Sequence, residues 1–129
     1  MQYTKDAPIK RAVYKFKLAW FKLSTKKQMP HEWRYTIGEQ IRNDILDMSK
    51  CVNVGYTMRD KSAKINYYNM AQGILVNIQD DFNMLNDLNV IDNETKAKMD
   101  IAIVDIQRQL SGLISSLTNE VKRDGAARQ

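Results

Sequence analysis

Between Met99 and Val121, apolar residues recur at alternating steps of four and three, and polar residues occupy most of the positions between them. This spacing is typical of a helix that packs lengthwise against other helices, because it places the apolar side chains on one face. The stripe consists of Met99, Ile103, Ile106, Leu110, Leu113, Leu117 and Val121. Such a stripe, about 33 Å long at 1.5 Å per residue, needs partner helices of similar length.

Three further segments carry apolar stripes at helical spacing. On the first, Ile9, Ala12, Val13, Phe16, Ala19, Trp20 and Leu23 share one face. Only five glycines and two prolines interrupt the 129 residues, far fewer than an all-β chain needs for its turns. The pattern therefore predicts one all-α domain, residues 1–129, folded as an antiparallel up-down-up-down four-helix bundle. The helices are expected at residues 7–26, 30–58, 63–88 and 93–123, with a frayed tail at 124–129 that begins near Gly125.

Local signals indicate where the helices begin. Pro8 occupies a first-turn position after Asp6, which we expect to act as the cap, and Pro30 opens the second helix in the same way. Asp92 is expected to cap the fourth helix. Gly38 lies inside the second helix, where glycine costs up to about 1 kcal/mol relative to alanine, so we expect another backbone from the first or fourth helix to approach it closely.

Positive charge is concentrated near the start of the chain. The net charge is +5, but residues 1–35 contain nine basic and two acidic side chains, whereas the remainder contains more acids than bases. A charged face is often only solvated, yet this excess is larger than solubility requires, so we expect an anionic partner. The candidate phosphate-binding residues are Lys10, Arg11, Lys15, Lys17, Lys22, Lys26, Lys27 and Arg34.

A second apolar stripe lies among these charges. Tyr14, Leu18 and Phe21 follow one another at steps of four and three on the arc away from the predicted core. Large side chains at this spacing usually pack on protein, which favours a subunit interface. The alternative is a surface on which nucleic-acid bases stack while lysines hold the phosphates.

The sequence has few residues that could carry catalysis. Cys51 is the only cysteine, which excludes an internal disulfide and a multi-cysteine zinc site, and His31 is the only histidine. Asp80 and Asp81 point about 100° apart on a helix, so together with Asp87 we interpret them as a solvated face. There is no glycine-rich phosphate loop, nucleophile elbow or Glu-x-x-His pair. We therefore expect a binding protein without catalytic site, metal, cofactor or small-molecule substrate.

No uncharged apolar run of 18 residues exists, and the start of the sequence lacks the features of a secretory signal. The expectations are therefore no membrane association and a cytoplasmic location.

Two stretches of the sequence together resemble a known family. Residues Pro30, Arg34, Tyr35, Ile37, Gly38, Ile41 and Arg42 resemble the start of the second helix in the four-helix bundle proteins of the ribosomal-RNA intervening-sequence and Avd type. The stretch Gln107 to Leu117, with Arg108, Leu110, Gly112 and Leu113, resembles the fourth-helix signature of the same family. The order and spacing of these motifs extend over most of the chain.

The resemblance implies properties beyond those that the residue pattern indicates. Proteins of this family form ring-shaped homopentamers of four-helix protomers. The Avd branch is the accessory variability protein of diversity-generating retroelements, which binds the reverse transcriptase and its template RNA and supports mutagenic cDNA synthesis without a catalytic site. The basic charge favours this branch, because a ring multiplies it. The alternatives are an intervening-sequence-type bundle and a purely structural, self-assembling protein without a nucleic-acid partner.

Overall fold

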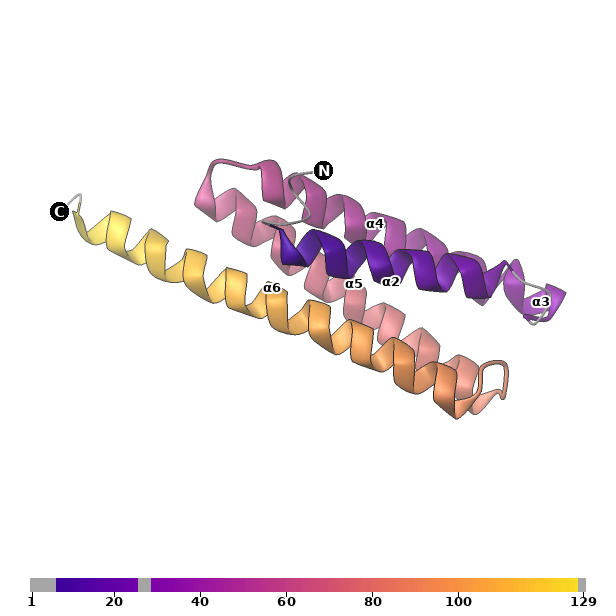
Figure 1. Ribbon diagram of the computed structural model, residues 1–129. Coiled ribbons are helices and arrows are strands. Elements are labelled where there is room, and N and C mark those ends of the chain that lie inside the picture. Colours follow the sequence, from indigo (N-terminus) through magenta and orange to yellow (C-terminus); the bar gives the residue numbers. More distant parts are fainter. Residues whose placement is uncertain (1–6, 26–28, 128–129) are drawn as a thin grey trace.

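Four long helices lie side by side in up-down-up-down order, as the computed structural model of the protein shows (Figure 1). The structure describes residues 7–25 and 29–127. A short helix separates the first two long ones, and the described residues contain no strand. The helices are α2 (Pro8–Ser24), α3 (His31–Arg34), α4 (Ile37–Thr57), α5 (Lys61–Asp87) and α6 (Asn93–Ala127). The predicted all-α four-helix bundle is confirmed.

Aromatic side chains at the centre of the core join α2 to α5. The Phe82 ring of α5 packs edge-on against Phe16 and Trp20 of α2, with ring centroids 6.1 Å and 4.9 Å apart. All three side chains are buried. The Trp20 indole Nε1 also donates a hydrogen bond of 3.5 Å to the Gly38 carbonyl, so this one side chain ties α2 to α4 as well as to α5.

The predicted inward face of α2 is confirmed at every position but one. Ile9, Val13, Phe16 and Trp20 are buried, and Ala12 and Leu23 are partly buried against the core. Ala19 is exposed, contrary to the prediction. It lies at the edge of the predicted sector, at 100° per residue.

The second predicted helix, residues 30–58, is interrupted and does not run continuously. Residues His31–Arg34 form α3, and α4 begins only at Ile37, because Thr36 has the non-helical backbone angles φ −117° and ψ −100°. A Cβ atom on Gly38 would lie 2.8 Å from the Trp33 carbonyl oxygen. The predicted close approach to Gly38 is therefore real, but it comes from the turn at α3 and not from the backbone of α2 or α6.

Side chains and carbonyls hold the α3 turn against α4. The Arg42 Nη2 donates to the Arg34 carbonyl at 2.8 Å, and the Thr36 hydroxyl donates to the Glu32 carbonyl at 2.6 Å. Met29 is buried beside Gly38, with its sulfur 3.1 Å from the position of an added Cβ. The apolar stripe continues across the break, which is why its periodicity did not reveal the interruption.

The predicted helix starts are mostly confirmed. Pro8 occupies the start of α2, whereas the proposed cap Asp6 lies outside the described residues. The Asp92 carboxylate accepts a hydrogen bond of 2.7 Å from the Thr95 backbone N–H, and its hydrogen bonds to Thr95 lower the pKa of Asp92. Asp60 caps α5 in the same way through the Ala63 N–H, at 2.9 Å.

The C-terminal helix continues beyond its predicted end. Helix α6 runs through Gly125 to Ala127, so the expected fraying from residue 124 is wrong for the described residues; 128–129 lie outside them. Lys61 at the start of α5 contacts Asp124 at 2.9 Å and Glu120 at 3.5 Å. A glycine ends a helix by adopting a left-handed conformation, and here Gly125 keeps a negative φ.

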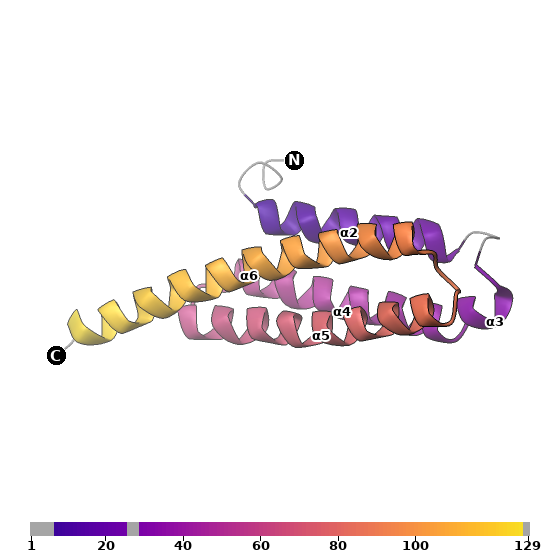
Figure 2. The same ribbon diagram turned by 90° about the horizontal axis from the view of Figure 1, so that it is seen from below.

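The helices differ strongly in length. Helix α2 has 17 residues and α6 has 35, which correspond to about 26 Å and 52 Å. The C-terminal half of α6 therefore extends past the start of α2 (Figure 2). The predicted stripe of α6 is buried from Met99 to Leu110 but only half-buried from Leu113 to Val121. Among residues 7–25 and 29–127, helix α2 covers only the first half of the stripe, because α2 begins at Pro8.

None of the described helices has an apolar stretch long enough to cross a membrane.

Candidate nucleic-acid interface

The outer face of α2 carries a stripe of positive charge. The helix contains five basic residues and no acidic residue. Three of the basic side chains, Arg11, Lys15 and Lys22, are exposed, and at 100° per residue they fall within an arc of about 40°. Within residues 7–25 and 29–127, none of the three forms an ion pair. The stripe is thus available to an anion over about 17 Å of helix.

Lys10 and Lys17 lie on the flank of α2 that faces α4. Both are half-buried. The Lys17 Nζ donates to the Ser49 hydroxyl at 3.4 Å, and the Lys10 Nζ lies 5.0 Å from the centre of the Tyr56 ring. Their aliphatic stems cover the α2–α4 junction while the ammonium groups stay near the surface. These two lysines can add to the positive potential, but they also have a packing role.

The other three predicted phosphate-binding residues are not on α2. Arg34 lies in α3, and its Nη2 donates a hydrogen bond of 3.0 Å to the Met29 carbonyl. The side chain is half-buried, and this hydrogen bond uses one of its donors to hold the turn. Lys26 and Lys27 lie outside the described residues. The structure thus brings together Arg11, Lys15 and Lys22, with Lys10 and Lys17 beside them.

The second apolar stripe of α2 lies at the surface, as predicted. Tyr14 is 58% exposed, Leu18 is 41% exposed and Phe21 is half-buried. With Lys17 and Leu46 they line a shallow hollow of about 250 Å³ between α2 and α4. The sequence analysis did not identify Leu46 as part of this patch. It could have been found from the sequence, because Leu46 is an apolar residue that lies outside the buried stripe of its own helix.

Carboxylates gather on α4 and α5. Burial, followed by the charges of Asp44 and Asp80, raises the pKa of Asp81, and burial with the charge of Asp47 raises that of Asp44. One oxygen of Asp81 is buried without a hydrogen-bond partner. The expectation that Asp81 simply faces solvent is therefore wrong, because the residue lies at the α4–α5 seam. Asp80 and Asp87 are exposed, as expected.

The described residues include no group of three His, Cys, Asp or Glu side chains that could hold a metal ion. His31 is exposed in α3, with its ring centroid 4.8 Å from that of Tyr35. Cys51 is buried, and burial raises the pKa of its thiol, which disfavours the reactive thiolate. The chemistry that these residues support best is electrostatic binding on α2. Compared with known proteins, the sequence matches no family model and no curated protein.

Proposed function

We propose that this protein is a non-catalytic module that binds RNA through the outer face of α2. The observation that carries the proposal is the stripe of Arg11, Lys15 and Lys22, exposed on one face of a helix without carboxylates. Such cations bind the phosphate backbone and release its counterions. Because phosphates carry no sequence information, the binding should have weak sequence preference.

The resemblance in sequence supports a more specific version of the proposal. In this version the protein is the accessory protein of a diversity-generating retroelement, it assembles as a homopentameric ring, and it binds both the reverse transcriptase and the template RNA. Each copy in the ring would present its own α2 stripe. The assembly would act as a scaffold that raises the local RNA concentration and sets the path of the RNA relative to the polymerase.

The salt dependence of RNA binding tests the electrostatic part of the proposal. Three phosphate contacts predict a slope of log affinity against log salt near −2, since each contact on a single strand contributes about −0.7. A filter-binding titration of the full chain with a single-stranded RNA measures this slope. RNA that stays bound with the same affinity from low to high salt would contradict the proposal.

We propose that Tyr14, Leu18 and Phe21 form the contact between protein subunits. Changing Tyr14 and Phe21 to serine removes the larger side chains of this exposed patch, so the particle mass measured by light scattering after size exclusion should fall. Met70 and Met84 of α5 are also exposed apolar residues, so the Met70→Ser, Met84→Ser double variant is the matched control and should keep its assembly. An unchanged mass for the Tyr14 and Phe21 variant would exclude this interface.

The same patch also supports the second candidate function, a self-assembling structural protein without a nucleic-acid partner. Tyr14 and Leu18 are exposed apolar side chains, and they could form a subunit contact whether or not α2 binds RNA. Under this alternative, the purified protein assembles but carries no RNA that a high-salt wash removes. The ratio of absorbance at 260 and 280 nm before and after the wash distinguishes the two functions.

A further inference from the structure

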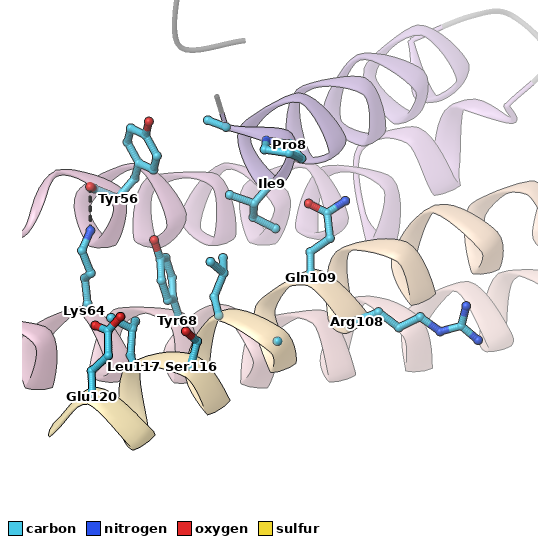
Figure 3. Close-up of a pocket in the computed structure, with 13 residues that line it drawn as sticks. Pro8, Ile9, Tyr56, Lys64, Tyr68, Arg108, Gln109, Ser116, Leu117 and Glu120 are labelled. Carbon is cyan, nitrogen blue, oxygen red and sulfur yellow. Dashed lines mark hydrogen bonds between the residues drawn. The ribbon is translucent and has the colours of Figure 1, made fainter. Parts of the chain in front are cut away.

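A groove opens beside the start of α2, and the second half of α6 forms one of its sides (Figure 3). Its volume is about 590 Å³. Leu113 and Leu117 of α6 are half-buried, and together with Ile9 of α2 and Tyr68 of α5 they form its apolar lining. The part of the chain that the structure describes leaves the groove open, so the two leucines can make further contacts.

A row of four α6 residues runs along this groove. The residues follow one another at steps of four, so they lie on the same side of the helix. They are Arg108, Gly112, Ser116 and Glu120. The close-up shows Arg108 and Glu120 at opposite ends of the row (Figure 3). The row thus has a cation at one end, an anion at the other and two small residues in the middle.

The order of charges along this part of α6 is complementary to its own reverse. Asp105 and Arg108 precede a stretch of eleven uncharged residues, and Glu120 and Arg123 follow it. In an antiparallel pair of α6 helices centred on Ile114, Arg108 of each copy lies opposite Glu120 of the other. Asp105 then lies opposite Arg123. A parallel pair places Arg108 beside Arg108 and Glu120 beside Glu120, where like charges repel. The charges therefore favour the antiparallel pair.

The charged side chains of the row can take part in such a pairing. Arg108 and Arg123 are exposed, and within residues 7–25 and 29–127 neither forms an ion pair. Asp105 is likewise exposed. One oxygen of Glu120 lies 3.5 Å from the Lys61 Nζ, and its second oxygen can accept a hydrogen bond from another donor.

The middle of the row suits a close approach of a second helix. A Cβ atom on Gly112 would meet no heavy atom within 4 Å, so no contact among the described residues requires glycine there. Glycine inside a helix is less favourable than alanine. Because Gly112 has no side chain, another helix can approach the α6 backbone at this point. In the antiparallel pair the residue opposite Gly112 is Ser116, which is also small and exposed.

We propose that α6 of a second copy of this chain lies antiparallel across the groove, around a two-fold axis. Each Gly112 then contacts Ser116 of the other copy, and Leu113 and Leu117 supply the apolar contact. The ion pairs at both ends set the register and the direction, since exposed ion pairs add little binding energy. A two-fold contact joins whole assemblies in pairs, so this inference depends neither on RNA binding nor on the proposed subunit contact on α2.

Disulfide formation between two single-cysteine variants tests this arrangement. In full-length protein with Cys51→Ala, Gly112→Cys carries a size tag and is mixed with untagged Ser116→Cys, and the copies exchange before mild oxidation. Because Gly112 faces Ser116 across the axis, the mixed dimer should form at least about fivefold faster than either like-with-like dimer. The matched control is Ser115→Cys, which is exposed but does not line the groove and should give no such preference.

Charge reversal is a second test, and it needs no cysteine. Arg108→Glu and Glu120→Arg each place like charges opposite one another, so each should raise the dissociation constant of the dimer at least about tenfold. The combined variant restores opposite charges and should return the constant to within about threefold of its original value. Lys122→Glu changes an exposed α6 residue outside the pairing and is the matched control. Sedimentation velocity measures the constant in chains that also carry Tyr14→Ser and Phe21→Ser.

Three results would overturn this contact. In the first, the chains with Tyr14→Ser and Phe21→Ser stay monomeric at every concentration. In the second, like-with-like disulfides form fastest, which indicates a parallel pair. In the third, the combined charge reversal associates no better than the single reversals, although circular dichroism shows the same helix content. Failure of the α2 contact or of RNA binding changes none of these measurements, because the two serine substitutions remove the α2 contact and no RNA is present.

Discussion

Replacing Arg11, Lys15 and Lys22 together by glutamate is expected to weaken RNA binding about 100-fold near 0.1 M salt. Each lost phosphate contact on a single strand lowers affinity about fivefold at this salt concentration, and three losses multiply. The three side chains are exposed and lie on the side of α2 away from the core, so helix content and assembly should not change. Fluorescence anisotropy with a labelled single-stranded RNA measures the affinity, and circular dichroism checks the fold.

A matched variant separates the α2 stripe from the net charge. Lys50, Lys122 and Arg123 are also exposed, and none of them lies on α2. Changing these three to glutamate alters the net charge by the same amount but leaves the stripe intact, so the loss of affinity should be no more than a few-fold, since it acts only through the long-range field. Equal losses in the two variants would show that RNA responds to total charge and has no site on α2.

Changing Trp20 to alanine is expected to lower the free energy of unfolding by about 4 kcal/mol. The side chain is fully buried, it packs edge-on against Phe82, and its indole N–H bonds to the Gly38 carbonyl. Its removal leaves a cavity where α2, α4 and α5 meet, and the Gly38 carbonyl loses the indole as a hydrogen-bond donor. Urea unfolding followed by circular dichroism measures the change.

Two control variants show how much of that loss comes from the aromatic packing of Trp20. Trp20→Phe keeps the aromatic contact with Phe82 and loses the hydrogen bond and part of the volume, so it should cost about 1–2 kcal/mol. Leu18→Ala removes a partly exposed side chain on the outer face of α2 and should cost less than about 1 kcal/mol in the monomer. If Trp20→Ala were as mild as Leu18→Ala, the packing of α2 on α5 would not be a main source of stability.

The hydrophobic pattern predicted the fold because each long helix carries one stripe that must be buried. Met99, Ile103, Ile106 and Leu110 are buried as the pattern predicted, but Leu113 and Leu117 are only half-buried. A stripe shows which side chains face inward and does not give the length of the helix opposite. The break at Thr36 was also invisible, since it is a matter of the Thr36 backbone angles and the apolar stripe continues across it.

The candidate site was only partly predictable for a similar reason. Charge and spacing were sufficient to place Arg11, Lys15 and Lys22 on one outer face, because that placement depends only on helical geometry. The Arg34 guanidinium donates a hydrogen bond to the Met29 carbonyl, five residues earlier in the chain, and the charge pattern did not predict this bond. Asp81 lies at the seam with α4, and its neighbour Asp44 comes from a different helix. Contacts that form only in the folded chain set the roles of these residues, and composition does not reveal them.

The uneven placement of charge on the bundle gives the molecule an electric dipole moment. All the charged side chains of α2 are basic, whereas Asp44, Asp80 and Asp81 form a cluster of negative charge on α4 and α5. In the field of any polyanion, such a molecule experiences a torque before it makes contact, and the torque turns α2 toward the source of the field. If a polyanion is the partner, as we propose, a larger share of collisions should begin in a productive orientation, which is expected to raise the association rate without adding a single contact.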